Sequence, residues 1–228
     1  MTYLLLVGGM SLIGMMVSGR LKNKFRQYSQ VPTQANMSGR EVAAAMLQHY
    51  GINDVKIVQG KGTLTDHYNP MSKTVSLSPH IYQGRTVMAA AVAAHECGHA
   101  VQHNTSYAWL KFRSALVPLV NISSKFQQIL IVVALGAASG GMGDTLLLIT
   151  IAVFSVTALF SFVTLPVEFD ASRRALEWLD DTGVARGAEY EGAKDALWWA
   201  AMTYVSAALS ALVMVLYLIL RYMGSSRR

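Results

Sequence analysis

The sequence predicts a mostly helical α+β fold, a multi-pass membrane protein with about four transmembrane helices and a compact polar domain. The 228 residues are 53% hydrophobic and 14% charged, with a mean hydropathy of +0.34, whereas soluble domains carry about 25% charged residues. The apolar residues gather in four long runs. The polar segments between these runs combine short alternating stretches with longer helical patterns.

Charge and cysteine content exclude several classes of protein. The net charge of +6 comes from basic residues that flank the apolar runs and do not form one stripe. We therefore expect a lipid bilayer as a partner and no nucleic acid. Cys97 is the single cysteine, which excludes an intramolecular disulfide and a disulfide-built secreted scaffold. The sequence leaves the oligomeric state open.

Each apolar run is close to the roughly 20 residues that a transmembrane helix needs. The first run has no charge and no cleavage site behind it, which predicts an uncleaved anchor. The second run is interrupted by Asn121, Lys125, Gln127 and Gln128, so its deep part is expected to begin at Phe126. The predicted transmembrane helices are residues 2–19, 115–138, 145–166 and 198–221. The alternative is that all four runs are buried core helices of a soluble protein.

The basic residues predict the orientation in the membrane. Sixteen of the nineteen Lys and Arg residues fall between Arg20 and Lys125 or between Arg173 and Lys194. Basic loops favour the cytoplasmic side. The sequence therefore predicts a protein of the inner (plasma) membrane whose polar segments, and any active site they form, face the cytoplasm.

Two polar segments lie between the predicted spans, residues 20–114 and residues 167–197. The first is expected to form the core domain and the second a helical segment. The predicted elements of the core domain are a helix at 41–50 behind a Ser38–Glu41 capping box, short strands at 55–58 and 74–78, and a long Ala-rich helix at 86–103.

The Ala-rich helix contains His95-Glu96-Cys97-Gly98-His99, an HExxH pattern. Residues i and i+4 lie on one helical face, so both imidazoles can reach one zinc ion. Glu96 is expected to hold a water and to take its proton as a general base. Because zinc lowers the pKa of its water to about 7, the pattern predicts one Zn²⁺ per chain and a hydrolytic activity.

A catalytic zinc site has three protein ligands and an open position, so a third ligand is expected elsewhere in the chain. Glu168 is the leading candidate, because Pro166 can start a helix there and the segment returns to the same membrane face as the histidines. The alternative is that Glu168 or Asp170 complements the N-terminal dipole of that helix. The residues alone leave both interpretations open.

Other polar side chains are weaker candidates for the site. His103 lies about 12 Å along the helix axis from His95, too far to share one ion with it. Cys97 is off the metal face and is expected to be a small buried residue. Two further histidines, His67 and His80, are expected to be structural, and three residues stay open as oxyanion partners: His80, Tyr82 and Tyr107.

Three stretches, residues 69–78, 93–102 and 165–176, resemble the bacterial membrane-bound neutral zinc metallopeptidases, the YugP-like family. More distantly, the chain is similar to the HtpX-type and CAAX prenyl endopeptidases, which share the gluzincin pattern. The resemblance covers most of the chain and implies a zincin-like domain. It implies that His95 and His99 bind zinc, that Glu96 is the general base and that Glu168 is the third ligand.

The resemblance also implies that the 74–78 strand is the edge of the cleft, where an extended substrate would add as a further strand. One position departs from the distant relatives. They place an aspartate four residues after the glutamate ligand, where it orients a ligand histidine. This chain has Ser172 at that position and its acidic residue at Asp170.

The sequence thus predicts an integral membrane zinc metalloendopeptidase that acts on peptides or on membrane and membrane-proximal proteins. One alternative is a catalytically silent zinc-binding membrane assembly or chaperone factor, and another is a zinc hydrolase with non-peptide substrates. A transporter-like bundle with metal-handling histidines ranks lower, because the runs 2–19 and 145–166 contain no ionisable side chain.

Overall fold

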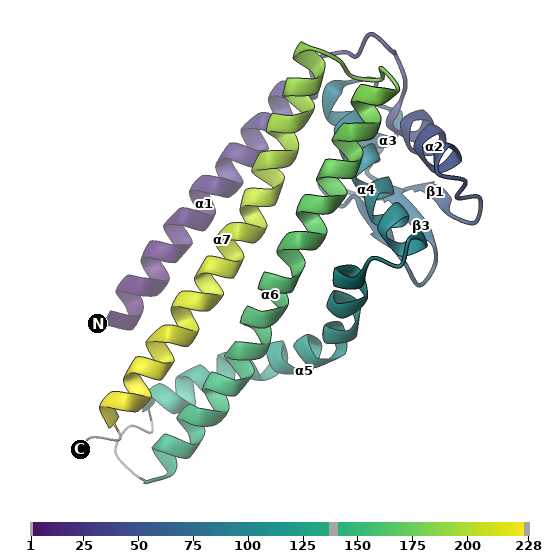
Figure 1. Ribbon diagram of the computed structural model, residues 1–228. Helices are drawn as coiled ribbons and strands as arrows, with labels where there is room; N and C mark the ends of the chain where they lie inside the picture. Colours follow the sequence, from purple (N-terminus) through teal and green to yellow (C-terminus); the bar gives the residue numbers. More distant parts are fainter. Residues whose placement is uncertain (1, 137–140, 226–228) are drawn as a thin grey trace. The chain divides into compact units, whose positions relative to one another are not determined.

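The computed structural model describes residues 2–136 and 141–225, which fold into helices and one small sheet (Figure 1). In chain order the elements are α1 (Thr2–Tyr28), α2 (Gly39–His49), β1 (Lys56–Gln59), β2 (His67–Asn69), β3 (Thr74–Leu77), α3 (Pro79–Gln83), α4 (Val87–Asn104), α5 (Ala108–Gly136), α6 (Gly141–Asp181) and α7 (Ala188–Ser225). The chain divides into two compact units. One comprises Met1–Met16, Phe112–Leu165 and Thr203–Arg228, and the other comprises Val17–Lys111 and Pro166–Met202.

Within the described residues, three helices are long and apolar enough to cross a membrane, so the prediction of four is wrong by one. These helices span Thr2–Tyr28, Gly143–Asp181 and Ala188–Gly224. The predicted span 115–138 does form helix, in α5, but Asn121, Lys125 and Gln127 interrupt its apolar run. Residues 137 and 138 lie outside the described part of the chain.

Two of the apolar helices continue far beyond the predicted spans. Helix α6 has 41 residues, which at 1.5 Å per residue is about 60 Å, twice the hydrocarbon thickness of a bilayer. Pro166 lies inside α6, so the expectation that it starts a separate helix is wrong. A proline inside a long apolar helix is tolerated where local adjustments satisfy the freed carbonyl. The predicted span and the segment that carries Glu168 are therefore one helix.

The sheet belongs to the second unit and has the strand order β1-β3-β2. Strand β3 pairs in parallel with β1, with Ile57 opposite Val75, and antiparallel with β2, with Tyr68 opposite Val75. The strand predicted at 74–78 is therefore central, and the expectation that it forms an open edge is wrong. The sequence did not reveal β2 because this strand has three residues within a turn-rich stretch, and those residues cover one side of β3.

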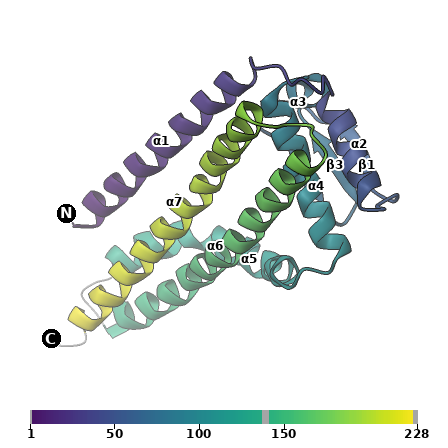
Figure 2. The same ribbon diagram turned by 45° about the horizontal axis from the view of Figure 1, so that its top comes forward.

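Helices α2 and α4 pack against this sheet and against each other; Figures 1 and 2 both show them grouped with α3, β1 and β3. The predicted capping box is present. The Ser38 backbone N–H donates to Glu41 Oε2 over 2.7 Å, and the Glu41 N–H donates to Ser38 Oγ over 3.3 Å. At the start of α4, the Thr86 side chain accepts from the Ala89 N–H. These caps satisfy backbone donors that a helix start would otherwise leave unpaired.

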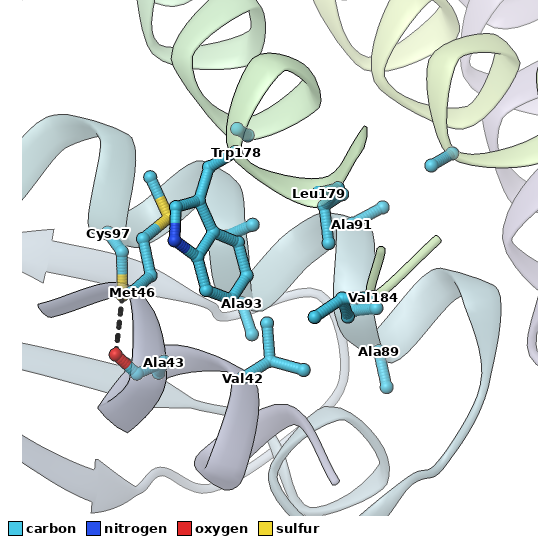
Figure 3. Close-up of a cluster of buried hydrophobic side chains, with 14 of the residues drawn as sticks. Val42, Ala43, Met46, Ala89, Ala91, Ala93, Cys97, Trp178, Leu179 and Val184 are labelled. Carbon is cyan, nitrogen blue, oxygen red and sulfur yellow. Dashed lines mark hydrogen bonds between the residues drawn. The ribbon is translucent and has the colours of Figure 1, made fainter. Parts of the chain in front are cut away.

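The core of the second unit is built from small and medium apolar side chains (Figure 3). Met46 of α2, Cys97 of α4 and Trp178 of α6 are among them, and all are buried. The Cys97 thiol donates to the Ala43 carbonyl over 3.6 Å. This confirms the prediction that Cys97 is a small buried residue, off the face of α4 that carries His95 and His99.

Candidate metal centre

Helices α4 and α6 approach each other closely at Gly98. A Cβ placed on Gly98 would lie 2.6 Å from the carbonyl oxygen of Ala171 and 3.1 Å from its Cα. Real side chains do not tolerate such distances, so a glycine is required at this crossing. The second small residue of the HExxH pattern thus brings the backbone of α6 against the helix that carries the two histidines.

The crossing brings His95, His99 and Glu168 together. Glu168 Oε2 lies 3.4 Å from His95 Nε2 and 3.6 Å from His99 Nε2, and the three side chains are 2–13% exposed. One candidate ligand atom from each residue lies within 4.8 Å of the other two. Among the His, Cys, Asp and Glu side chains of the described chain, these three form a group that could hold a metal ion.

The donor set fits zinc. A tetrahedral zinc ion with ligands at 2.0–2.2 Å holds its ligand atoms about 3.4 Å apart, which matches the two separations from Glu168 Oε2. Two imidazoles and one carboxylate are the protein ligands of a zinc site that keeps one position open. The alternative for Glu168, that it complements a helix start, is wrong because α6 begins at Gly141 and Glu168 lies deep inside it.

The far nitrogens of both histidines are held by polar side chains. Ser172 Oγ lies 3.1 Å from His95 Nδ1, and Gln102 Oε1 lies 3.0 Å from His99 Nδ1. Ser172 thus occupies the position where the distant relatives have an aspartate, and it contacts a candidate ligand histidine. Partners on Nδ1 direct Nε2 toward the metal position.

Gln102 is fully buried, and its orientation is fixed by two acceptors. Its Nε2 donates to the Val167 carbonyl over 2.8 Å and to Asp170 Oδ2 over 2.9 Å. Its Oε1 therefore faces His99 as an acceptor, so a neutral His99 carries its hydrogen on Nδ1 and keeps a lone pair on Nε2. That lone pair points toward the Glu168 carboxylate, an arrangement that a cation between the two atoms stabilises.

Asp170 is held in turn by two arginines. Arg174 Nε donates to Asp170 Oδ2 over 2.6 Å and Arg173 Nη2 to Asp170 Oδ1 over 2.5 Å. The sequence singled out Asp170 as a possible complement of a helix dipole and as the acidic residue near the position of the distant relatives' aspartate, and it did not reveal Gln102. The available signal was spacing: Gln102 follows His99 by three residues, which places both on one helical face.

Glu96 lies between the two histidines in the sequence and is 8% exposed. Burial raises the pKa of its carboxyl above the ordinary value. The charges of His95 and His99 oppose this effect, and the carboxylates of Glu168 and Asp66 add to it. A carboxylate whose pKa is raised toward neutrality is a stronger base, as general-base chemistry requires.

The remaining histidines are not part of this cluster. His103 Nδ1 lies 2.8 Å from the Tyr68 hydroxyl, and His67 Nδ1 lies 2.8 Å from the Thr65 carbonyl. His80 is exposed on α3 and lines a separate pocket. No described contact tests an oxyanion role for His80, Tyr82 or Tyr107, so that role stays a prediction.

The described chain thus combines three helices long and apolar enough to cross a membrane with a cluster of His95, His99 and Glu168 that could hold a metal ion. The chain belongs to the family whose model is described as "Putative neutral zinc metallopeptidase", which matches residues 3–223. It is 38% identical over 208 residues to the "Putative membrane protease YugP" of Bacillus subtilis (strain 168), covering 90% of this chain and 89% of that relative. This confirms the resemblance seen in the sequence. No solved structure matches the chain.

Proposed function

We propose that this protein is an integral membrane zinc metalloendopeptidase. The observation that carries the proposal is the convergence of His95 Nε2, His99 Nε2 and Glu168 Oε2 at separations that fit one tetrahedral zinc ion. Zinc, when bound, supplies Lewis acidity and lowers the pKa of a water to about 7. Membership of a zinc metallopeptidase family supports the same assignment.

In this proposal separate residues bind the metal, orient the ligands and transfer the proton. His95, His99 and Glu168 hold the metal, and Ser172 and Gln102 orient the two imidazoles. Glu96 accepts a proton from the attacking water and delivers it to the leaving amine, since a buried carboxyl with a raised pKa can do both.

We propose membrane or membrane-proximal proteins as substrates, at a site on the cytoplasmic face of the plasma membrane. The support for a membrane setting comes from the three apolar helices and from the relative's description as a membrane protease. The cytoplasmic face rests on the basic residues between Arg20 and Lys125. Glu168 lies two residues after Pro166, where the apolar stretch of α6 ends. In the sequence of α6, this candidate ligand therefore comes directly after the part of the helix suited to lipid. Because β3 is central, an extended substrate would pair with an outer strand.

The test is to replace Glu96 by Gln in the full chain, purified in detergent. We expect about one zinc per chain in both proteins, with cleavage of an unfolded model membrane protein reduced by roughly 100-fold or more in the variant. Equal cleavage by the two proteins would overturn the role of Glu96. Zinc binding without cleavage by the wild-type protein would favour the silent assembly or chaperone factor.

A further inference from the structure

A cavity with charged and apolar lining residues lies in the same unit, and none of the three candidate metal ligands lines it. It encloses about 640 Å³ and is lined by the last turns of α1, the loop before β2, α3 and the start of α4. The lining residues are Lys22, Phe25, Arg26, Ser29, Gln30, Thr63, Leu64, His80, Gly84 and Thr86. Its volume is in the range of cavities that bind small ligands.

The helix α1 presents one face to this cavity. Lys22, Phe25 and Arg26 are spaced i, i+3 and i+4 and therefore lie in one row along the helix, and Ser29, at i+7, directly follows its end. These residues give two cations, an aromatic ring between them and a hydroxyl. The residues that line the cavity include no aspartate or glutamate, so its electrostatic potential favours an anion.

The two basic residues of this row differ from their neighbours on α1. Lys24 forms an ion pair with Asp195 at 2.7 Å, and the Arg20 guanidinium lies 6.0 Å from the centre of the Trp199 ring. Within the described chain, neither Lys22 nor Arg26 has a carboxylate within ion-pair distance. Alternate basic residues of α1 are thus engaged in the fold, while the pair facing the cavity is available to a ligand.

The position of the row along α1 indicates where such a ligand comes from. The uncharged run of α1 ends at Gly19, and Lys22 and Arg26 follow it by about 5 and 10 Å along the helix axis. The headgroup layer on each side of the hydrocarbon core is about 5–8 Å thick. If the apolar run of α1 spans the bilayer, Lys22 lies within the headgroup layer. Arg26 lies just outside this layer, and its long side chain leans back toward the N-terminus of the helix and so toward the lipid phosphates.

We propose that this cavity binds a phosphate-bearing anion, supplied by the headgroup of an anionic phospholipid. Lys22 and Arg26 contact the phosphate, and the hydroxyls of Ser29, Thr63 and Thr86 surround the polar part of the headgroup. Phe25 and Leu64 offer apolar surface to the glycerol and the first acyl carbons. Basic pockets beside membrane helices bind anionic headgroups through the same combination of charge and apolar contact.

The experiment is a titration of the detergent-purified full chain with phosphatidylglycerol, followed by native mass spectrometry. The test variant is Lys22→Gln/Arg26→Gln. The control variant is Lys56→Gln/Lys194→Gln, which removes the same charge from exposed residues outside the cavity. All three proteins are compared in zinc content and thermal unfolding, so that a folding defect is recognised.

We expect the test variant to bind phosphatidylglycerol about 20- to 30-fold more weakly than the wild type, since each cation near an anionic headgroup contributes about a fivefold factor. The control should bind as the wild type does, and phosphatidylcholine should bind weakly to all three. Equal affinity of test variant and wild type, or an equal loss in the control, would overturn the proposal. Displacement of the lipid by an equal concentration of glycerol 3-phosphate would overturn the lipid source and assign the cavity to a soluble phosphate.

Discussion

At the scale of single residues, the candidate site depends on partners that orient each ligand. Ser172 lies against His95 Nδ1 and Gln102 against His99 Nδ1. An imidazole that is held on one nitrogen loses little rotational freedom when the other nitrogen binds a metal. The two contacts thus orient both Nε2 atoms toward the same metal position.

We predict that Gln102→Leu weakens zinc binding by roughly 10- to 100-fold, as loss of a ligand-orienting partner typically does. The substitution removes the acceptor for His99 and the donor to Asp170 and the Val167 carbonyl. Competition with a fluorescent zinc chelator measures the affinity. Gln48→Leu, on an exposed position of α2, is the matched control and should leave the affinity unchanged.

Since Gln102 is buried, its loss also reduces stability, so thermal unfolding is measured on the zinc-free proteins. A variant that melts earlier but binds zinc as tightly as the wild type would show that Gln102 has a packing role alone.

At the scale of elements, the site is a crossing of two helices. The HExxH spacing places two histidines on one face of α4, and Gly98 allows the backbone of α6 to approach that helix. Glu168 follows His99 by about 70 residues in the sequence. It reaches the two histidines because Gly98 lets α4 and α6 pack closely. The crossing therefore couples the packing of α4 and α6 to the geometry of the ligands.

We predict that Gly98→Ala destabilises the protein by about 1–3 kcal/mol, the usual cost of overpacking, and weakens zinc binding. The added Cβ would lie 2.6 Å from the Ala171 carbonyl oxygen and force the two helices apart. The free energy of unfolding and the zinc affinity are measured together. In Gly14→Ala, a matched control on α1, the new Cβ meets nothing within 4 Å, so this variant should keep its zinc affinity and lose no stability. Unchanged zinc affinity in Gly98→Ala would show that the crossing does not set the ligand geometry.

The sequence pointed to the three side chains that the fold brings together, whereas parts of the fold around them could not be predicted. His95 and His99 could be selected because ligand chemistry restricts the residue types and helical geometry restricts the spacing. For Glu168 the residues alone left two interpretations open, and the family resemblance implied the ligand role. Gln102 could not be selected, because a glutamine three residues after a histidine is common on helices without any metal. Strand β2 and the interior position of Pro166 were missed because tertiary packing decides both.

At the scale of the whole molecule, the described chain has three helices apolar enough to cross a membrane, and it belongs to a family described as "Putative neutral zinc metallopeptidase". Helices α6 and α7 each have more residues than a bilayer crossing needs, and residues of α6 beyond its apolar stretch carry Glu168. The same helix thus contains an apolar stretch long enough to cross a membrane and a candidate metal ligand.

The measurement that tests the central claim most directly is zinc per chain in the detergent-purified protein, with Glu168→Gln beside the wild type. Glu191→Gln, an exposed residue of α7, is the control for loss of a carboxylate. We predict about one zinc per chain in the wild type and the control, and much less in Glu168→Gln. A full zinc content in Glu168→Gln, or no zinc in a folded wild-type protein, would contradict the assignment of His95, His99 and Glu168 as one metal centre.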